Sequence, residues 1–148
     1  MLQRIFTIDF EGEGRILGHE QYDVPIIEGA LEKNLEKMFS ILENTKTSPS
    51  FFMLASTAEK YPLIVKKIAE KYDIGTHSYN HTLVHIQSVK EFSQDLKKSI
   101  DIIQQLTGKK VNKYRSPGFS LSKPEYMEQL IENGIEIDCS LTPTNHFY

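Results

Sequence analysis

The feature that most constrains the fold of this chain is a regular alternation of strand-like and helix-like segments. Strand-like runs rich in β-branched or apolar residues are expected at residues 3–9, 50–55, 72–76, 111–114 and 135–139. Amphipathic helices are expected between them, over residues 28–44, 57–69, 92–106 and 123–132. Such alternation predicts an α/β fold in which about five parallel strands and four helices are joined by right-handed crossovers.

The length of the chain limits how far this pattern can extend. A closed eight-unit barrel takes about 200–250 residues, whereas this sequence has 148. No repeat, low-complexity tract or linker interrupts residues 1–148, so we expect one incomplete domain. The sequence therefore predicts a partial (β/α) barrel with an open sheet edge after its fifth strand, where self-association could cover the unpaired backbone groups.

Composition excludes several classes of function. The formal net charge is −3, which gives no basic patch for nucleic acid. No apolar run approaches the 18 residues of a membrane span, and the N-terminus does not look like a secretory signal. The single Cys139 cannot form an intramolecular disulfide. We therefore expect a cytoplasmic protein without a membrane span and without a nucleic-acid partner.

The sharpest chemical feature is a pair of histidines, His77 and His81, directly after the third strand. We expect them on a helical turn, where residues four apart share a face and can share one ion. Zinc takes imidazole nitrogens and frequently adds a carboxylate. The alternative is a solvated turn without a ligand.

Two further clusters follow other strands. Asp9 and Glu11 end the first strand and, being two residues apart, point to the same side while Phe10 turns away. A pair of this kind can also be a solvated strand terminus. Arg115 follows the fourth strand and precedes a loop containing Gly118; its rigid fork can orient a carboxylate, although an arginine before a turn needs no such role.

Together, these segments resemble the polysaccharide deacetylases, the NodB-homology domain of carbohydrate esterase family 4. Asp9-Phe10-Glu11 is similar to the first motif of that family, and the segment from His77 to His81 is similar to its histidine motif. Arg115-Ser-Pro-Gly118 is similar to its Arg-x-Pro motif. The resemblance extends from about residue 4 to residue 146 and implies that all three segments lie on one rim.

The resemblance also implies roles for individual residues. Asp9 is the general base, His77 and His81 bind metal, and Arg115 orients Asp9. The family commonly has two adjacent aspartates in its first motif, so the separation by Phe10 makes Glu11 the candidate metal ligand and leaves open which carboxylate touches the ion. The backbone N–H of Gly118 contributes to the oxyanion hole, at a position where many members carry an aromatic residue.

The remaining histidines have weaker assignments. We expect His85 to be at the surface or behind the ligands, and His146 to be a loop residue. His19 could line the mouth of the site. The family uses a late histidine as general acid, and the sequence reaches Tyr148 before the motif that carries it.

These features predict a metal-dependent N-deacetylase, a hydrolase that uses one divalent ion, zinc, and acts on an N-acetylated sugar or polysaccharide intermediate. The alternative is a catalytically impaired carbohydrate-binding or assembly protein on a truncated deacetylase fold. A third reading is that the chain is a fragment of a longer enzyme.

Overall fold

The computed structural model describes residues 5–12, 29–121 and 123–141, and its centre is one parallel sheet. The strands follow each other in space in the order of the sequence: β1 (Thr7–Phe10), β2 (Ser50–Met53), β3 (Asp73–Thr76), β4 (Lys113–Tyr114) and β5 (Ile137–Asp138). Every neighbouring pair is parallel. The predicted α/β class and the five parallel strands are therefore confirmed. In the described residues, β1 and β5 are the two outer strands of the sheet.

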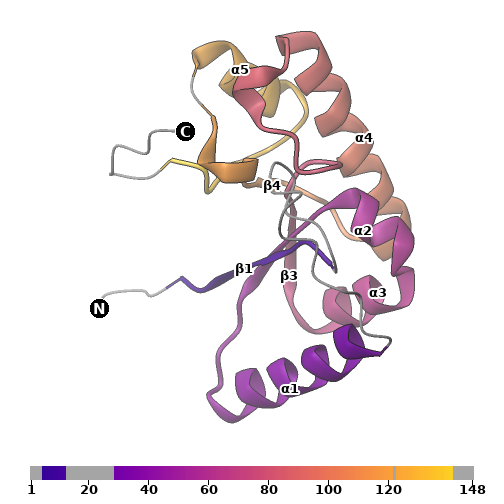
Figure 1. Cartoon of the computed structure of the whole chain (residues 1–148). Helices are drawn as coiled ribbons and strands as arrows, with labels where there is room; N and C mark the ends of the chain where they lie inside the picture. Colours follow the sequence, from indigo (N-terminus) through magenta and orange to yellow (C-terminus); the bar gives the residue numbers. More distant parts are fainter. Residues whose placement is uncertain (1–4, 13–28, 122, 142–148) are drawn as a thin grey trace, which may run out of the picture.

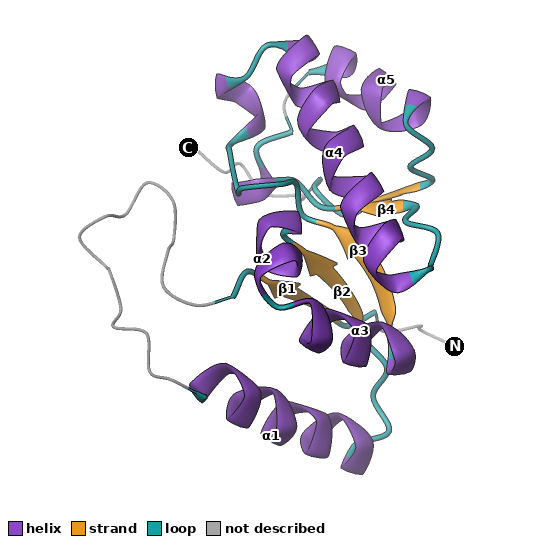
Figure 2. Cartoon of the chain, turned by 90° about the vertical axis from the view of Figure 1, so that its right-hand side faces the viewer, coloured by secondary structure: helices purple, strands orange, loops and turns teal. Residues whose placement is uncertain are grey.

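In the residues that the structure describes, five α-helices accompany these strands: α1 (Ala30–Asn44), α2 (Ala55–Lys60), α3 (Pro62–Lys71), α4 (Val89–Thr107) and α5 (Pro124–Glu132). Two short 3₁₀ segments, η2 (Val84–Ile86) and η3 (Pro117–Phe119), lie in the loops after β3 and β4. The helices form an arc along one side of the sheet (Figures 1 and 2), as expected for part of a barrel. No helix among the described residues is both long enough and apolar enough to cross a bilayer.

The prediction of four helices was wrong in one place. The segment predicted as a single helix over 57–69 is divided at Pro62, which begins α3. Proline lacks the N–H that would continue α2, and it suits the first position of a new helix. Helix α2 begins two residues before the predicted start, with Leu54 at its N-cap position.

The two faces of the sheet have different roles. Phe51 and Met53 of β2 are fully buried in the core beneath the helices, as expected for a strand covered on both sides. Phe52 points the other way and is also fully buried, although it does not belong to that core cluster. In the register of the sheet, Phe52 is flanked by Asp9 of β1 and Gly75 of β3. The side chains of the candidate site stand on this second, inner face.

Gly75 allows the inner face to pack closely. A Cβ atom at this position would lie 2.8 Å from the carbonyl oxygen of Lys113 and 2.8 Å from the ring of Phe52. Both distances are below ordinary van der Waals contact. Only glycine therefore lets β3 pass between the Phe52 ring and the backbone of β4.

Helix α4 lies behind β3 and is the longest helix described. Ser88 and Glu91 form a capping box at its start, and Gly108 ends it in a left-handed conformation with φ 69°. Phe92 and Leu96 bury its apolar face. A hydrogen bond between the hydroxyls of Thr76 and Ser99 ties the helix to the end of β3. This contact places α4 directly behind the loop that carries the histidines.

Candidate active site

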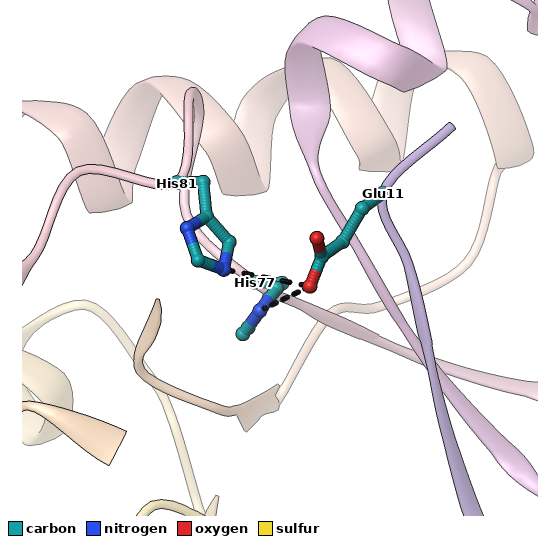
Figure 3. Close-up of side chains that lie close together, drawn as sticks. All are labelled: Glu11, His77 and His81. Carbon is teal, nitrogen blue, oxygen red and sulfur yellow. Dashed lines mark ion pairs between the residues drawn. The ribbon is translucent and has the colours of Figure 1, made fainter. Parts of the chain in front are cut away.

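Three potential metal ligands converge at the carboxyl ends of the strands. Glu11 follows β1, whereas His77 and His81 follow β3, and their ligand atoms all lie within 4.8 Å of one another. One carboxylate oxygen of Glu11 is 3.4 Å from Nε2 of His77 and 3.4 Å from Nε2 of His81 (Figure 3). In the described part of the chain, this is the only cluster of three such residues. It joins two segments that are more than 60 residues apart in the sequence.

A backbone contact fixes the orientation of His77. Its Nδ1 lies 2.8 Å from the carbonyl oxygen of Arg115, and since a carbonyl only accepts, Nδ1 carries the proton. In the neutral ring Nε2 is then an acceptor that faces the Glu11 carboxylate. Two facing acceptors need a proton or a cation between them. Ligating histidines in metal sites are oriented by such contacts at the opposite nitrogen.

The electrostatics of Glu11 follow from the same contacts. When the rings of His77 and His81 are protonated, their hydrogen bonds and positive charges hold the pKa of the Glu11 carboxyl well below its usual range. Burial opposes this shift but does not overcome it. Glu11 is therefore a carboxylate, the form that binds metal. At His81, the buried Nδ1 has no hydrogen-bond partner among the described residues.

The second carboxylate, Asp9, has a different partner. Nη1 of Arg115 donates to Oδ1 of Asp9 at 2.8 Å, and Nη2 donates to the hydroxyl of Thr7 at 2.8 Å. Glu11 faces the histidines and Asp9 faces the arginine, although both leave the same side of the strand. Phe10 between them is buried in the core, as the alternation predicted.

Aromatic rings hold the guanidinium of Arg115 from two directions. Its central carbon lies 4.6 Å from the ring centroid of Phe52 and 5.6 Å from that of Phe119, within the range of cation–π attraction. Its Nε also contacts the carbonyl oxygen of Cys139 at 3.4 Å. Arg115 is thus held in one plane, with its fork directed at β1.

Gly118 lies in η3 with φ 57°, in the left-handed region that favours glycine. A Cβ atom here would lie 2.8 Å from Cδ2 of Leu83. Leu83 therefore occupies the space next to this backbone position, and a larger residue at 118 would have to displace it. The next residue, Phe119, is 37% exposed and also has a positive φ of 53°.

The histidine loop differs from the sequence prediction. His77 and His81 were expected on a helical turn, but residues 77–83 are not helical. Instead, Ser78 and His81 adopt left-handed φ angles of 70° and 59°, and the loop folds back so that the two imidazole centroids lie 5.0 Å apart. The four-residue spacing of the histidines correctly predicted that their rings lie close together. The helical turn from which this was predicted is absent from residues 77–83, where the loop folds back instead.

Other residues near the site were missed or lie elsewhere. Thr7 and Phe52, which contact Arg115, were not predicted from the sequence. The available signal was the alternation of side chains along the strands, which places both residues on the same face of the sheet as Asp9. His85 is exposed in η2. His19 and His146 lie outside the described residues.

The fold and the site together define an α/β protein with an acidic and histidine-containing cluster on the rim of a curved parallel sheet. The family model for polysaccharide deacetylases matches residues 23–136 of the chain. The chain therefore belongs to the polysaccharide deacetylase family. The matched range contains both histidines of the cluster and Arg115, whereas Asp9 and Glu11 lie before it.

Individual relatives are similar over part of their length. A peptidoglycan-N-acetylglucosamine deacetylase of Bacillus cereus is 34% identical over 73 residues, which are 49% of this chain and 26% of that protein. The peptidoglycan deacetylase PdaC of Bacillus subtilis superposes with a TM-score of 0.66 at 20% identity, over 91% of this chain and 57% of the other. A carbohydrate esterase family 4 pseudoenzyme of Bacillus anthracis gives a TM-score of 0.69 at 17% identity, over 90% and 42%. The chain thus spans about a quarter of the curated relative and about half of these solved structures.

Proposed function

We propose that this chain carries the metal-binding and base-bearing part of a metal-dependent deacetylase that removes acetyl groups from an N-acetylated carbohydrate. One observation carries the proposal: the ligand atoms of Glu11, His77 and His81 converge within 4.8 Å, beside an Asp9 carboxylate oriented by Arg115. Membership of the polysaccharide deacetylase family supports the reaction class.

The donor set fits one divalent ion, and we propose zinc. Two imidazole nitrogens and one carboxylate oxygen form a combination typical of catalytic zinc sites, which keep a fourth position for water or substrate. The orientation of His77 by the carbonyl of Arg115 supports this assignment, because it directs Nε2 toward Glu11. We assign the metal to Glu11 rather than Asp9, since Asp9 is paired with arginine.

A bound divalent ion would supply Lewis acidity for the acyl carbonyl and lower the pKa of a water molecule. The residues of the chain contribute the rest. Asp9 accepts the proton of the attacking water, and Arg115 keeps its carboxylate in one orientation. The backbone N–H of Gly118 donates to the oxygen on which negative charge develops. As the C–N bond breaks, the departing nitrogen takes a proton from solvent or from the protonated Asp9, and the products are acetate and a free amine.

The substrate and the location are proposals as well. The relatives from Bacillus cereus and Bacillus subtilis are described as deacetylases of peptidoglycan, and we propose an N-acetylated sugar or polysaccharide intermediate here. A net charge of −3 gives no support for a nucleic-acid partner. The free thiol of Cys139 suits a reducing compartment, and we propose a cytoplasmic location.

A carbohydrate-binding or assembly protein is the second candidate. The observation that favours it is the open sheet, because in the described residues β1 and β5 each pair with only one strand. Outer strands present unpaired backbone groups that another chain or a second copy can cover. Such a protein would bind metal and sugar without turnover.

Hydrolysis of two acetyl substrates separates the two candidates. We expect the zinc-loaded protein to hydrolyse 4-nitrophenyl acetate, whose leaving group needs no proton, and to release acetate from an N-acetylglucosamine oligomer more slowly. Chelator-treated protein should do neither. Zinc binding without hydrolysis of either substrate would favour the binding protein.

A further inference from the structure

A half-buried carboxylate on α4 lies directly behind the histidine loop. Oδ1 of Asp95 accepts the backbone N–H of Tyr79 at 3.0 Å, and the hydroxyl of Ser78 acts on the same carboxyl by lowering its pKa. Ser78 and Tyr79 stand between the two histidines in the sequence. Asp95 thus contacts the part of the loop that connects one candidate ligand to the other.

Backbone hydrogen bonds hold the rest of this segment to β2 and to the first turn of α2. The N–H of His77 donates to the carbonyl oxygen of Met53 at 2.8 Å. In the other direction, the N–H of Ala55 donates to the carbonyl oxygen of Ser78 at 3.1 Å, and the N–H of Ser56 donates to that of Tyr79 at 3.0 Å. The N–H of Tyr79 is directed to the other side, where Asp95 is its acceptor. Buried N–H groups are almost always paired, so loss of this carboxylate would leave the Tyr79 amide without its partner.

The turn that Asp95 supports is one that the backbone disfavours. Ser78 has a φ of 70°, a region in which the Cβ atom of a non-glycine residue is crowded. Its hydroxyl is fully buried and also lies 3.2 Å from the hydroxyl of Tyr114. Tyr114 precedes Arg115, whose carbonyl orients His77. Hydrogen bonds at Tyr79 and Ser78, joined by the backbone between these two residues, therefore link α4, the left-handed turn and the end of β4.

The charge of Asp95 is compensated at this position. Burial raises the pKa of its carboxyl, and the Tyr79 amide, the Lys98 ammonium and the Ser78 hydroxyl counteract this effect. Lys98 lies one turn further along α4, with its ammonium 3.3 Å from the ring centroid of Tyr79. The carboxylate therefore has donors and a cation on the side that faces the loop.

We propose that Asp95 is a positioning residue for the metal site: by holding the left-handed turn at Ser78, it keeps the imidazoles of His77 and His81 directed at Glu11. This inference rests on the proposed metal site. Because the three ligands come from two separate segments, their affinity for an ion depends on how often the histidine loop presents both rings to Glu11 together. Asp95 does not touch the ion; it acts through the backbone between the two ligands.

The test compares zinc affinity in variants of two aspartates on the same helix. Asp95→Ala should weaken zinc binding by about 10- to 100-fold, as substitutions of outer-shell partners do. Asp95→Asn keeps an oxygen that can accept the Tyr79 N–H, so it should lose much less affinity. Asp101→Asn and Asp101→Ala are the matched controls, since Asp101 is exposed on α4, and they should bind as the original protein does. Unchanged zinc affinity in Asp95→Ala would overturn the inference while leaving the metal site intact.

A second measurement does not depend on zinc. Hydrogen exchange of the Tyr79 amide in metal-free protein should be faster in Asp95→Ala than in Asp101→Ala, while amides of β2 keep their protection. If the original protein binds no zinc, the proposed function fails, and this exchange still reports on Asp95. Equal exchange of the Tyr79 amide in both variants would show that Asp95 does not hold the turn.

Discussion

Nη1 of Arg115 lies 2.8 Å from Oδ1 of Asp9, although the two residues are 106 positions apart in the sequence. Their strands, β4 and β1, are separated in the sheet by β2 and β3. Three strand spacings amount to about 14 Å between backbones in a flat sheet. The contact therefore crosses the inner face, above Phe52, and it brings the first and third sequence motifs to one point.

Substitution of Glu11 tests which carboxylate binds metal. Glu11→Gln should lower zinc affinity by more than the roughly 10- to 100-fold that outer-shell changes cost, because it removes the anionic ligand. Asp9→Asn should leave the affinity nearly unchanged, since Asp9 faces arginine. Isothermal titration of metal-free protein measures both. A larger loss in Asp9→Asn than in Glu11→Gln would reverse the two assignments.

The fork of Arg115 supports a second prediction. Arg115→Lys keeps the positive charge but cannot donate to Asp9 and Thr7 with one planar group. We expect kcat/KM for 4-nitrophenyl acetate to fall by about 10²-fold, as for small misplacements of catalytic groups.

Zinc affinity provides the internal control for this variant. It should stay close to that of the original protein, because the carbonyl that orients His77 belongs to the backbone. Unchanged kcat/KM in Arg115→Lys would contradict the role of the fork.

Gly75 supports a prediction about stability. Gly75→Ala places a methyl group 2.8 Å from the Lys113 carbonyl and the Phe52 ring, and overpacking of this kind costs about 1–3 kcal/mol. Urea unfolding followed by circular dichroism should show a lower midpoint. Glu36→Ala, on the exposed side of α1, is the control and should unfold like the original protein. Equal urea midpoints for Gly75→Ala and Glu36→Ala would contradict the close packing at Gly75, because they would mean that β3 and β4 can move apart without a loss of stability.

The sequence predicted the sheet because the alternation of segments is a local signal. Strand positions were correct to within a few residues, and the helix predicted over 92–106 lies within α4. The division at Pro62 was missed, even though proline inside an apolar pattern is a signal for a helix boundary. The apolar spacing of Ile64, Ile68 and Ala69 concealed this break, since these residues are buried within α3. Leu63, which the same pattern would also bury, is exposed.

The site was predictable only in its residue types. Spacing and resemblance selected the carboxylates, His77, His81 and Arg115, but they left open whether Asp9 or Glu11 faces the histidines. That distinction depends on where β3 and β4 end relative to β1, which the order and register of the sheet determine. The left-handed turn at Ser78 and its support by Asp95 could not be predicted, because they arise from the packing of α4 against the loop.

Zinc-dependent hydrolysis of 4-nitrophenyl acetate tests the central claim most directly. The rate is measured for chelator-treated and zinc-loaded protein, with Asp9→Asn loaded to the same zinc content. We predict hydrolysis in the zinc-loaded protein alone, and a fall of about 10²- to 10⁴-fold in Asp9→Asn, the usual contribution of a general base. Full zinc occupancy without hydrolysis above the Asp9→Asn variant would contradict the assignment of this rim as a hydrolytic site.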